Sequence, residues 1–581
     1  MMKRLFLTFA VAAVALCCVA QNDNDVLMTV GNETITKGQF VNAYQKNNLL
    51  SNATEKDLRE YLDLFVNYRL KVQDATAAQM DTAKAFRTEL ESYKNQSAQQ
   101  YLIDTEVSDF LLEEAFERSK YQVNASHILF RCEQNASPKD TMAAYQKALT
   151  TREKIMNGLD FNEAAYLYSE DESARDYMNP QTQRMHPGNR GRLGYFSVME
   201  MIYPFESAAY NTPVGSVSMP IRTQFGYHLI YVHDKVPAMS KVFVSQIFVK
   251  DTNALMNVSN AKVKAKLDEI QKAYKSGKTF EELAALYSED VATKNVGGKM
   301  DPFVPSRRPG NYVAAAINLK PGEISEPVPT TLGWHILKLD SIVYMVPSEE
   351  SKFLLKNRLS RDVRAKKSKE SLIAKLKVEY NYQEPGKAAA MKFFGKNIPD
   401  TYFQSTALDI ETLKGLQKLK PMCTYADQTL TAADFAHYVS RFQGSQLKGI
   451  VRQFLEEIFP NFVNENMIRY EHGRLMDKYP EYKELVNEFH DGMLLYEINS
   501  EKVWNAAIQD TVGLEKFYET IKSEYPVDAP NDSIQFKPMS EIRAIVVSRY
   551  QDYLDNAWIQ ELRSRYPVKI DEKVFQSILK K

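Results

Sequence analysis

Cysteine is scarce in this chain of 581 residues, which contains four. Cys17 and Cys18 lie within the first twenty residues, so Cys132 and Cys423 are the two in the rest of the chain. Two cysteines so far apart in sequence give no disulfide framework. Neither lies in a Cys/His motif of the kind that activates a nucleophile. We therefore interpret both as buried or inert thiols.

Long apolar runs and familiar catalytic motifs are also missing. After residue 20, no uninterrupted apolar stretch approaches the roughly 18 residues that a membrane-spanning helix needs. The formal net charge is −1, which favours neither nucleic acid nor stable membrane insertion. The basic run at 361–369 is interpreted as a solvated helix face. The chain has no phosphate-binding glycine loop, His-Glu-x-x-His, Gly-x-Ser-x-Gly or paired Cys-x-x-Cys, so we predict no cofactor and no metal.

The first twenty residues predict an export signal. Lys3 and Arg4 form a positive start, residues 5–16 are apolar, and small residues at 18–20 precede a predicted cut ahead of Gln21. Lipidation at one of the two cysteines here is the alternative, although the residue before each is bulkier than a lipoprotein signal normally tolerates. Export of a large chain with few cysteines favours the periplasm of a Gram-negative cell.

The length and composition predict several globular domains. A chain of 581 residues is too long for one hydrophobic core. Hydrophobic residues at 44% and charged residues at 25% are ordinary globular values. The 33 tyrosines and 29 phenylalanines either fill the cores or offer contact area to a partner.

One segment of the chain occurs twice. The first copy opens with VNASHILF and the second with VFVSQIFV, and both continue into a Tyr-Ser-Glu-Asp sequence and a strand with Gly-aromatic-His. The corresponding ranges are 123–130 with 242–249, 162–171 with 281–290, and 223–232 with 331–339. The offset is 119 residues at the first two pairs and 107 between His228 and His335. Such a repeat indicates two copies of one small domain.

These segments resemble the parvulin family of peptidyl-prolyl isomerases over roughly residues 122–345. The resemblance implies small antiparallel sheets wrapped by helices, and rotation of X–Pro bonds without a covalent intermediate. It assigns a catalytic set: His127, Asp171, Thr223 and His228. It assigns a substrate-binding set around the proline ring: Leu193, Met201, Phe205 and Phe225.

Two other interpretations of the histidines stay open at this point. They can be ordinary core residues with satisfied hydrogen bonds. With Asp171 they also have the chemistry of a metal site, which the resemblance disfavours. An isomerase needs no metal and no covalent intermediate, because it has only to bind the twisted amide more tightly than the planar one.

The second copy lacks part of this set. Gln246 replaces the first histidine, Arg308 and Tyr312 replace the methionine and phenylalanine of the pocket, and Met300-Asp301 replaces Leu-Gly. The matching aspartate, threonine and histidine remain: Asp290, Thr330 and His335. A guanidinium in a proline pocket would have to be desolvated, which is costly. We expect the second domain to be weakly active or inactive.

A second duplication flanks the first. Residues 26–36 predict a hairpin, Thr36 and Gln39 a capping box, and residues 58–75 and 85–104 helices. Similar sequences recur 395 to 397 residues later, at 430–439, 459–467 and 481–489. Two further segments resemble each other, each predicted as a long helix followed by a short strand: 359–382 and 547–570. We refer to these two segments as returns.

The order of these parts resembles the SurA-type and PpiD-type periplasmic chaperones, in which isomerase domains are inserted into a helical module. We expect a multidomain α+β protein. The predicted division is: 1–20 export signal, 21–121 N-terminal helical module, 122–237 first parvulin-like domain, 238–345 degenerate second domain, 346–396 return and linker, 397–581 second helical module with its own return. The predicted breakpoints are 384–386 and 527–538.

The resemblance implies a periplasmic isomerase and chaperone whose partners are unfolded exported polypeptides, above all outer-membrane proteins. Two alternatives remain, a non-catalytic holdase and a scaffold of the cell envelope with vestigial isomerase domains.

Overall fold

The computed structural model describes residues 24–46, 49–134, 136–178, 185–251, 254, 261–404, 408–445, 450–527 and 535–579. The predicted export signal lies outside these residues. The chain divides into two compact units, Met1–Leu102 with Glu465–Lys581 (unit 1) and Ile103–Asn464 (unit 2). Helices and small antiparallel sheets occur together, which confirms the α+β class. Among the helices described, none combines the length and apolar character needed to cross a membrane.

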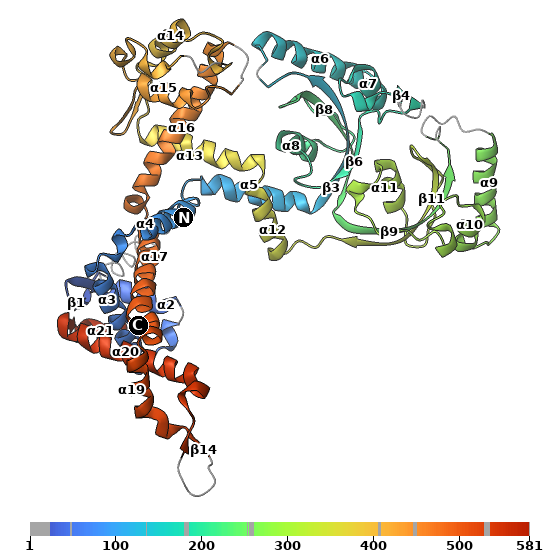
Figure 1. The fold of residues 1–581 in the computed structure, drawn as a ribbon. Helices are drawn as coiled ribbons and strands as arrows, with labels where there is room; N and C mark the ends of the chain where they lie inside the picture. Colours follow the sequence, from blue (N-terminus) through green and yellow to red (C-terminus); the bar gives the residue numbers. More distant parts are fainter. Residues whose placement is uncertain are drawn as a thin grey trace, which may run out of the picture. The chain divides into compact units, whose positions relative to one another are not determined.

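The first repeat domain, in unit 2, is built on a four-stranded antiparallel sheet of order β6-β3-β8-β7. Helices α6 and α7 pack on one face of the sheet and α8 on the other (Figure 1). Its elements are β3 Tyr121–Arg131, α6 Pro138–Met156, α7 Phe161–Tyr168, η3 Glu172–Ala174, β4 Tyr177–Met178, β5 Met185–His186, β6 Arg192–Phe196, α8 Tyr203–Asn211, β7 Ile221–Thr223 and β8 Gly226–Pro237.

The second repeat domain has the same plan with a three-stranded sheet of order β10-β11-β9. Its elements are β9 Met239–Lys250, α9 Ala261–Lys275, α10 Phe280–Tyr287, η5 Lys294–Val296, η6 Pro305–Arg307, α11 Gly310–Ile317, β10 Val328–Pro329 and β11 Gly333–Tyr344. Tyr195, on β6 of the first domain, is buried in the core of the second, beside Tyr312 and Val313. The two repeats therefore share a packed contact.

The rest of unit 2 is mainly helical. Helix α5 precedes the repeats in sequence and packs on α12 and α13, which follow them. The elements are α5 Thr105–Ser119, α12 Glu349–Leu359, η7 Val363–Ala365, α13 Lys366–Glu379, α14 Lys387–Asn397, η8 Tyr402–Gln404, η9 Ile410–Thr412, η10 Leu416–Lys418, β12 Cys423–Tyr425, β13 Gln428–Leu430, α15 Ala432–Ser440 and the start of α16 Val451–Lys478.

Unit 1 combines the two ends of the chain. Its N-terminal elements are β1 Val26–Val30, β2 Glu33–Thr36, α2 Lys37–Gln45, η1 Leu50–Asn52, α3 Glu55–Ala77, η2 Met80–Thr82 and α4 Lys84–Ala98. After α16 follow α17 Pro480–Asn499, the π-helical η11 Ser500–Trp504, α18 Asn505–Gln509, α19 Thr511–Ile521, η12 Lys522–Glu524, β14 Pro526–Val527, β15 Gln535–Phe536, α20 Met539–Arg565, β16 Val568–Ile570 and α21 Glu572–Ile578.

The predicted hairpin and its capped helix are confirmed. Strands β1 and β2 pair across the turn at Gly31, and Thr36 forms a capping box with Gln39 at the start of α2. The second copy repeats both features in β12, β13 and α15, where Thr431 and Asp434 form the box. The helix predicted at 85–104 ends earlier, since α4 stops at Ala98.

Each hairpin is completed by the return that the sequence assigned to the other copy. Strand β16, at the end of the chain, pairs with β1, while Gln383, just after α13, pairs with Thr424 of β12. The same hydrogen bond occurs in both: Gly31 N–H donates to Pro567 O at 2.9 Å, and Ala426 N–H donates to Tyr380 O at 2.8 Å. The prediction that the second module ends in its own return is therefore wrong, because the two copies have exchanged these segments.

Helices α4 and α17, which are copies of each other, meet in unit 1. Tyr93 and Phe489, which are 396 residues apart, stack with ring centroids at 3.7 Å. Phe86 contacts the His490 ring. Tyr482, the counterpart of Phe86, donates to Lys94 O at 3.0 Å. Equivalent residues thus make reciprocal contacts, as in a dimer formed by exchange of a segment.

A pair of engineered disulfides tests the exchange. In a background with Cys132→Ala and Cys423→Ala, Thr29→Cys with Lys569→Cys should cross-link under oxidation, because these residues are direct partners in the sheet. Thr424→Cys with Gln383→Cys should cross-link for the same reason.

The control is Thr424→Cys with Lys569→Cys. This pair would join the second hairpin to the return at 547–570, which the sequence assigned to the same module. We expect no intramolecular cross-link from this pair by peptide mass mapping. A cross-link there, with none at the first pair, would contradict the exchange.

Candidate functional site

A cavity of about 780 Å³ opens in the first repeat domain. Seven of the eight predicted site residues line it: His127, Asp171, Leu193, Met201, Phe205, Phe225 and His228. Thr223 lies behind the lining and is buried against His228. The lining also includes the buried thiol Cys132 and residues that the sequence did not single out: Leu129, Arg131, Glu133, Glu200, Ile202 and Gln224. Their position in the repeat gave no signal of chemistry.

Strand alternation places the two histidines on the same face. Successive side chains of a strand point to opposite faces, so His127 shares the α8 side of β3 with Val123 and Ala125. His228 shares that side of β8 with Ile230. The rings of His127 and His228 then stack with centroids at 5.6 Å, and Phe205 of α8 meets both rings edge-on.

A chain of hydrogen bonds runs through the catalytic set. Asp171 accepts from His127 Nε2 at 3.0 Å, so this nitrogen carries the proton. His127 Nδ1 and His228 Nδ1 lie 3.3 Å apart, within hydrogen-bond distance. His228 Nε2 accepts from the Thr223 hydroxyl at 2.8 Å, and Thr223 Oγ1 accepts from Phe225 N–H at 3.1 Å. Every polar atom of the chain is thereby satisfied.

Electrostatics favour this neutral arrangement at the inner histidine. Burial, and then the neighbouring His127 ring, lower the pKa of His228 to about 3. The hydrogen bond from His127 holds the pKa of Asp171 well below its usual range. His228 is therefore uncharged near neutral pH and acts by orientation, whereas Asp171 presents an ionised carboxylate to the cavity.

The opposite wall of the cavity is apolar. Phe205 is 4% exposed and packs with Leu193, Met201 and Ile202. Phe225 is 54% exposed and lies at the rim. Apolar side chains on one side and an ordered polar chain on the other suit a ligand with a hydrocarbon ring beside an amide.

The second repeat domain keeps the chain of hydrogen bonds but builds it partly from other residues. Gln246 Oε1 accepts from His335 Nδ1 at 3.0 Å, and Gln246 Nε2 donates to Asp290 at 2.7 Å. Thr330 and His335 are 2.9 Å apart, as in the first domain. The buried Tyr312 hydroxyl also donates to Gln246. An amide thus replaces the first histidine, and a polar hydroxyl lies where Phe205 lies in the other copy.

Arg308 does not enter this second site as a desolvated charge. Its guanidinium lies over the Phe303 ring at 5.4 Å, and the side chain is half-buried. The contact between the cation and the ring, with access to water, avoids the desolvation cost that the sequence suggested.

A buried ion cluster joins the first repeat domain to the helices of unit 2. Glu206, the residue after Phe205, is fully buried and accepts two hydrogen bonds at 2.9 Å from Arg364 of η7. It also accepts from Arg118 of α5 at 3.0 Å and from Met199 N–H at 2.6 Å. The helix that carries the apolar wall is thereby anchored to segments before and after both repeats.

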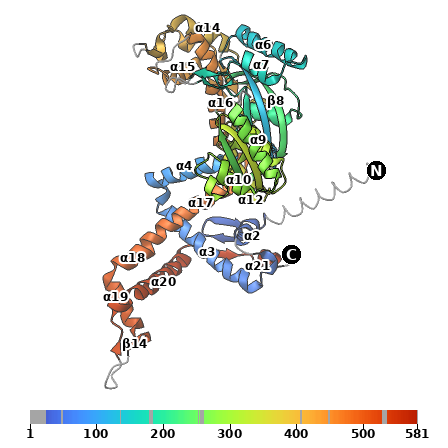
Figure 2. The ribbon, with the colours of Figure 1, turned by 90° about the vertical axis from the view of Figure 1, so that its right-hand side faces the viewer.

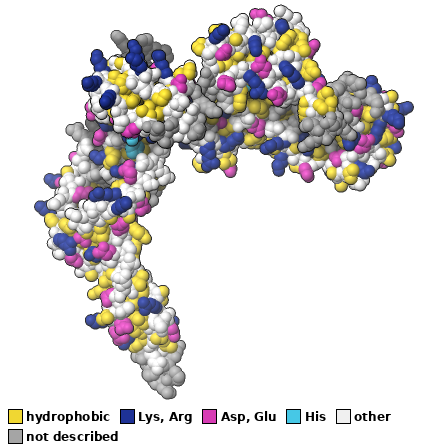
Figure 3. Space-filling view, turned by 45° about the horizontal axis from the view of Figure 1, so that its top comes forward, with side chains coloured by type: hydrophobic (Ala, Val, Ile, Leu, Met, Phe, Trp, Pro, Cys, Tyr) yellow, Lys and Arg dark blue, Asp and Glu magenta, His cyan; other side chains and the backbone are white. Residues whose placement is uncertain are grey.

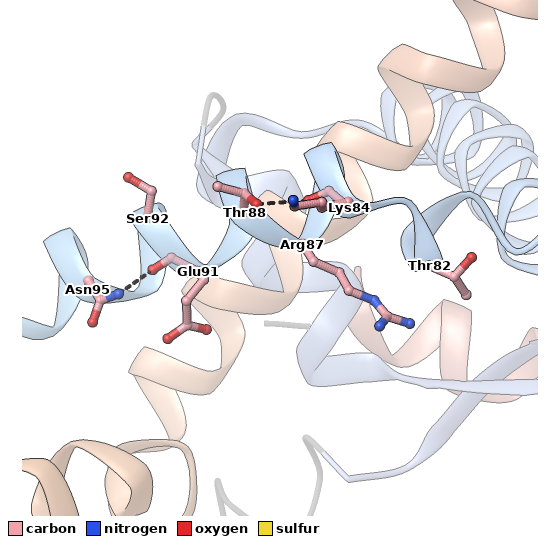
Figure 4. A pocket seen from close by; sticks show the side chains of 7 residues that line it. All are labelled: Thr82, Lys84, Arg87, Thr88, Glu91, Ser92 and Asn95. Carbon is pink, nitrogen blue, oxygen red and sulfur yellow. Dashed lines mark hydrogen bonds between the residues drawn. The ribbon is translucent and has the colours of Figure 1, made fainter.

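Another hollow, on η2 and α4 of unit 1, has no comparable chemistry. Figure 4 shows its lining side chains, of which Thr88 and Asn95 bond back to α4 carbonyls at Lys84 and Glu91. The hydrogen bonds drawn there stay within one helix. We interpret this hollow as ordinary helix surface.

Comparison with known proteins agrees with this geometry. The family described as the rotamase or PPIC-type PPIase domain matches residues 127–234 and 247–341. Both repeat domains thus match the PPIC-type rotamase model, and we refer to them as the first and second rotamase domains. The first matched range contains the whole hydrogen-bond chain of the first domain, and the second contains Asp290, Thr330 and His335 but begins one residue after Gln246.

The curated relatives include proteins named Chaperone SurA. The one from Nitrosococcus oceani is 24% identical over 340 residues, which cover 58% of this chain and 71% of that protein. The one from Salmonella typhimurium is 29% identical over 223 residues, which cover 38% of this chain and 49% of that protein. The chain thus spans only about half the length of the Salmonella relative.

Among solved structures, a peptidylprolyl isomerase (PrsA) from Bacillus anthracis is 29% identical. The match covers 24% of this chain and 60% of that one, with a TM-score of 0.17. That TM-score is too low to support any inference about the arrangement of the whole chain.

The buried histidine makes the first rotamase domain sensitive to acid. The unfolded chain protonates His228 as the pH falls through 6.5, whereas the folded domain keeps it neutral to about 3. The unfolded state then binds more protons, so the free energy of unfolding decreases as the pH falls through this window, by about 2 kcal/mol at pH 5 from this residue.

Protection factors of the β3 and β8 amides, corrected for intrinsic exchange, should show this loss between pH 7 and about 5. In His228→Gln the share due to His228 should disappear, since glutamine does not titrate. An equal loss in the variant would show that the effect arises elsewhere.

Proposed function

We propose that the protein is an exported peptidyl-prolyl isomerase and chaperone. The first rotamase domain, residues 122–237, isomerises X–Pro bonds, and the helical parts of both units hold unfolded clients. The observation that carries the proposal is the hydrogen-bond chain Thr223–His228–His127–Asp171, which lies beside an apolar cavity wall. The rotamase match and the relatives named Chaperone SurA support it.

The geometry suits rotation about an amide bond. Rotation costs about 18–20 kcal/mol because the amide loses resonance. Leu193, Met201 and Phe205 would bind the proline ring, and burial there would desolvate the amide. Asp171, held by His127, would stand beside the carbonyl end and favour the twisted form. His228 and Thr223 act as positioning residues, because His228 holds His127 Nδ1 and Thr223 in turn holds His228.

The second rotamase domain, residues 238–345, serves in this proposal as a binding or spacing element. Its Tyr312 hydroxyl is tied to Gln246 and Met300. A proline ring would have to displace this polar group and leave it unsatisfied. The second domain thus has the same fold but lacks the apolar wall that would bind a proline ring.

The proposal also covers clients and location. An export signal and relatives named as SurA chaperones support the periplasm as the compartment and unfolded outer-membrane proteins as the clients. A holdase without isomerase activity is the second candidate, favoured by the large helical share of both units.

Matched double variants of the full chain test the assignment to the first domain. Met201→Ala with Phe205→Ala should lower kcat/KM on short proline peptides by about 100-fold or more, since the dry wall is lost. Arg308→Ala with Tyr312→Ala should change it less than about twofold. Because Phe205 is buried, its loss costs several kcal/mol, and circular dichroism must confirm folding. The reverse pattern would mean that the second domain is the active one.

The same variant separates holding from catalysis. If the helical parts hold clients, Met201→Ala with Phe205→Ala should still suppress aggregation of a urea-denatured porin to about the wild-type extent, measured by light scattering. Loss of suppression in the folded variant would place client binding in the rotamase cavity instead. Wild-type chain with full suppression and no isomerase activity would favour the holdase.

A further inference from the structure

The second rotamase domain packs directly against the strand that carries part of the first cavity. Its segments η6 and α11 contact β6 of the first domain. Figure 1 draws α11 beside β6, and the two domains adjoin in Figure 2 as well. Their contact is buried, and the hydrophobic side chains visible on these domains in Figure 3 are scattered among charged ones. Strand β6 thus serves both domains, with Leu193 in the first cavity and Tyr195 in the second core.

The contact lies at an irregular point of β6. Its pairing with β3 shifts register between Arg192 and Gly194, so Leu193 has no direct partner. Such a bulge re-aims a side chain, and here Leu193 lines the cavity and packs with the apolar wall. Gly194 has a φ of 78°, which favours glycine. The direction of the Leu193 side chain therefore depends on the backbone of this bulge.

A glycine of the second domain abuts the bulge. A Cβ built on Gly310, the first residue of α11, would lie 2.8 Å from Gly194 Cα and 3.1 Å from Asn124 Oδ1. Carbon atoms that are not bonded pack best at about 3.5–4.0 Å, so a side chain at residue 310 would have to displace the strand. The φ of Gly310 does not lie in the left-handed region. The close approach of the two domains therefore explains the glycine.

The equivalent corner of the first domain is built for a different neighbour. The offset of 107 residues matches Gly310 to Tyr203 and Ser306 to Met199. Tyr203 and Met199 pack on α5 and α12. The same corner thus docks the first domain on helices and the second domain on β6. A large tyrosine serves the first contact, whereas the second needs a residue without a side chain.

Hydrogen bonds extend this contact to the rim of the cavity. The Ser306 hydroxyl donates to Glu200 Oε1 at 3.1 Å, and Glu200 is one of the lining residues. Glu200 Oε2 accepts from Ser197 N–H at 2.7 Å. Just before β6, Gly191 O accepts from His127 N–H at 2.8 Å, which holds the start of the strand within its own domain. A push at the middle of β6 would therefore act on the bulge and the rim first.

We propose that the second rotamase domain is a positioning element of the first site. Gly310 and Ser306 hold the bulge of β6 and the rim at Glu200, and so fix the direction in which Leu193 meets the proline ring of an X–Pro substrate. The second domain lacks an apolar wall of its own and completes the wall of its neighbour. The inference rests on the proposed function, because it takes the first cavity as the isomerase site.

Gly310→Ala in the full chain tests this role. The added methyl group should raise the KM for a short proline peptide about fivefold and change kcat less than about twofold, since a misplaced Leu193 weakens binding of planar and twisted forms alike. Gly492→Ala is the matched control, because a Cβ there meets nothing within 4 Å, and both constants should stay at the wild-type values. Arg308→Ala with Tyr312→Ala keeps the backbone of Gly310, so its small expected effect is consistent with this role.

Two further readouts separate positioning from general destabilisation. In ¹³C-methyl spectra of the full chain, Gly310→Ala should shift the resonances of Leu193 and leave those of Leu229, which is buried on the opposite face of the sheet. Ser306→Ala should raise the KM about twofold, and Ser306→Thr, which keeps the hydroxyl, should restore it. Ser276→Ala, an exposed change in the same domain, should leave the KM unaltered.

Four results would overturn the inference. A wild-type KM with unshifted Leu193 resonances in the folded Gly310→Ala variant would leave the proposed function intact but remove this role. Shifts at Leu193 and Leu229 alike, with loss of circular dichroism, would make the contact one of folding only. If Gly310→Ala does not fold, equal KM values for wild type, Ser306→Ala and Ser306→Thr would refute the role. A wild-type chain without isomerase activity would remove the proposed function and this role together.

Discussion

The buried carboxylate of Glu206 ties together parts of unit 2 that are far apart in sequence. Its partners Arg118 and Arg364 come from before and after the two rotamase domains. Removing one partner of such a cluster leaves a buried charge without compensation, which typically costs about 3–5 kcal/mol. Because Phe205 directly precedes Glu206 on the same helix, the cluster also fixes the apolar wall of the cavity. The site thus depends on a contact outside its own domain.

The exchange of returns has a similar consequence for unit 1. Strand β1 near the start of the chain has β16 near its end as a partner, and Trp558 donates to Asp74 within the buried contact between α20 and α3. Such long-range pairing requires closure of a loop of more than 500 residues, although the entropic cost of closure grows only with the logarithm of length. Once α3, α20 and the sheet share a core, the cost is offset by burial of apolar side chains such as Leu62 and Leu562.

Comparison of the two rotamase domains shows which part of the site both copies keep. The polar chain persists in the second domain although an amide replaces a histidine, because buried polar groups on β9 and β11 must find partners in any case. The apolar wall does not persist, since Tyr312 places a hydroxyl there. The hydrogen-bond chain is thus common to both domains, whereas the apolar wall distinguishes the domain that we propose to be catalytic.

The sequence by itself determined the local and repeated features. Turn and cap residues such as Gly31, Thr36 and Gln39 act over a few residues, so the hairpin and the start of α2 could be predicted. The resemblance to the parvulin motif also assigned His127, Asp171 and Phe205 to one site, and all three line one cavity. The length of α4 was overestimated, since helix ends depend on what packs nearby.

Only the tertiary structure decided which distant segments pair. Both returns have the same pattern, so either could complete either hairpin, and the choice of β16 for β1 depends on packing across the whole of unit 1. The Glu206 cluster was equally invisible, because its two arginines look like surface charges until the fold buries them. Leu112 and Ile508 are similar apolar residues on helices of the two modules. Leu112 packs against the first rotamase domain, whereas Ile508 is exposed. The presence of a neighbouring domain determines this difference, and no local pattern encodes it.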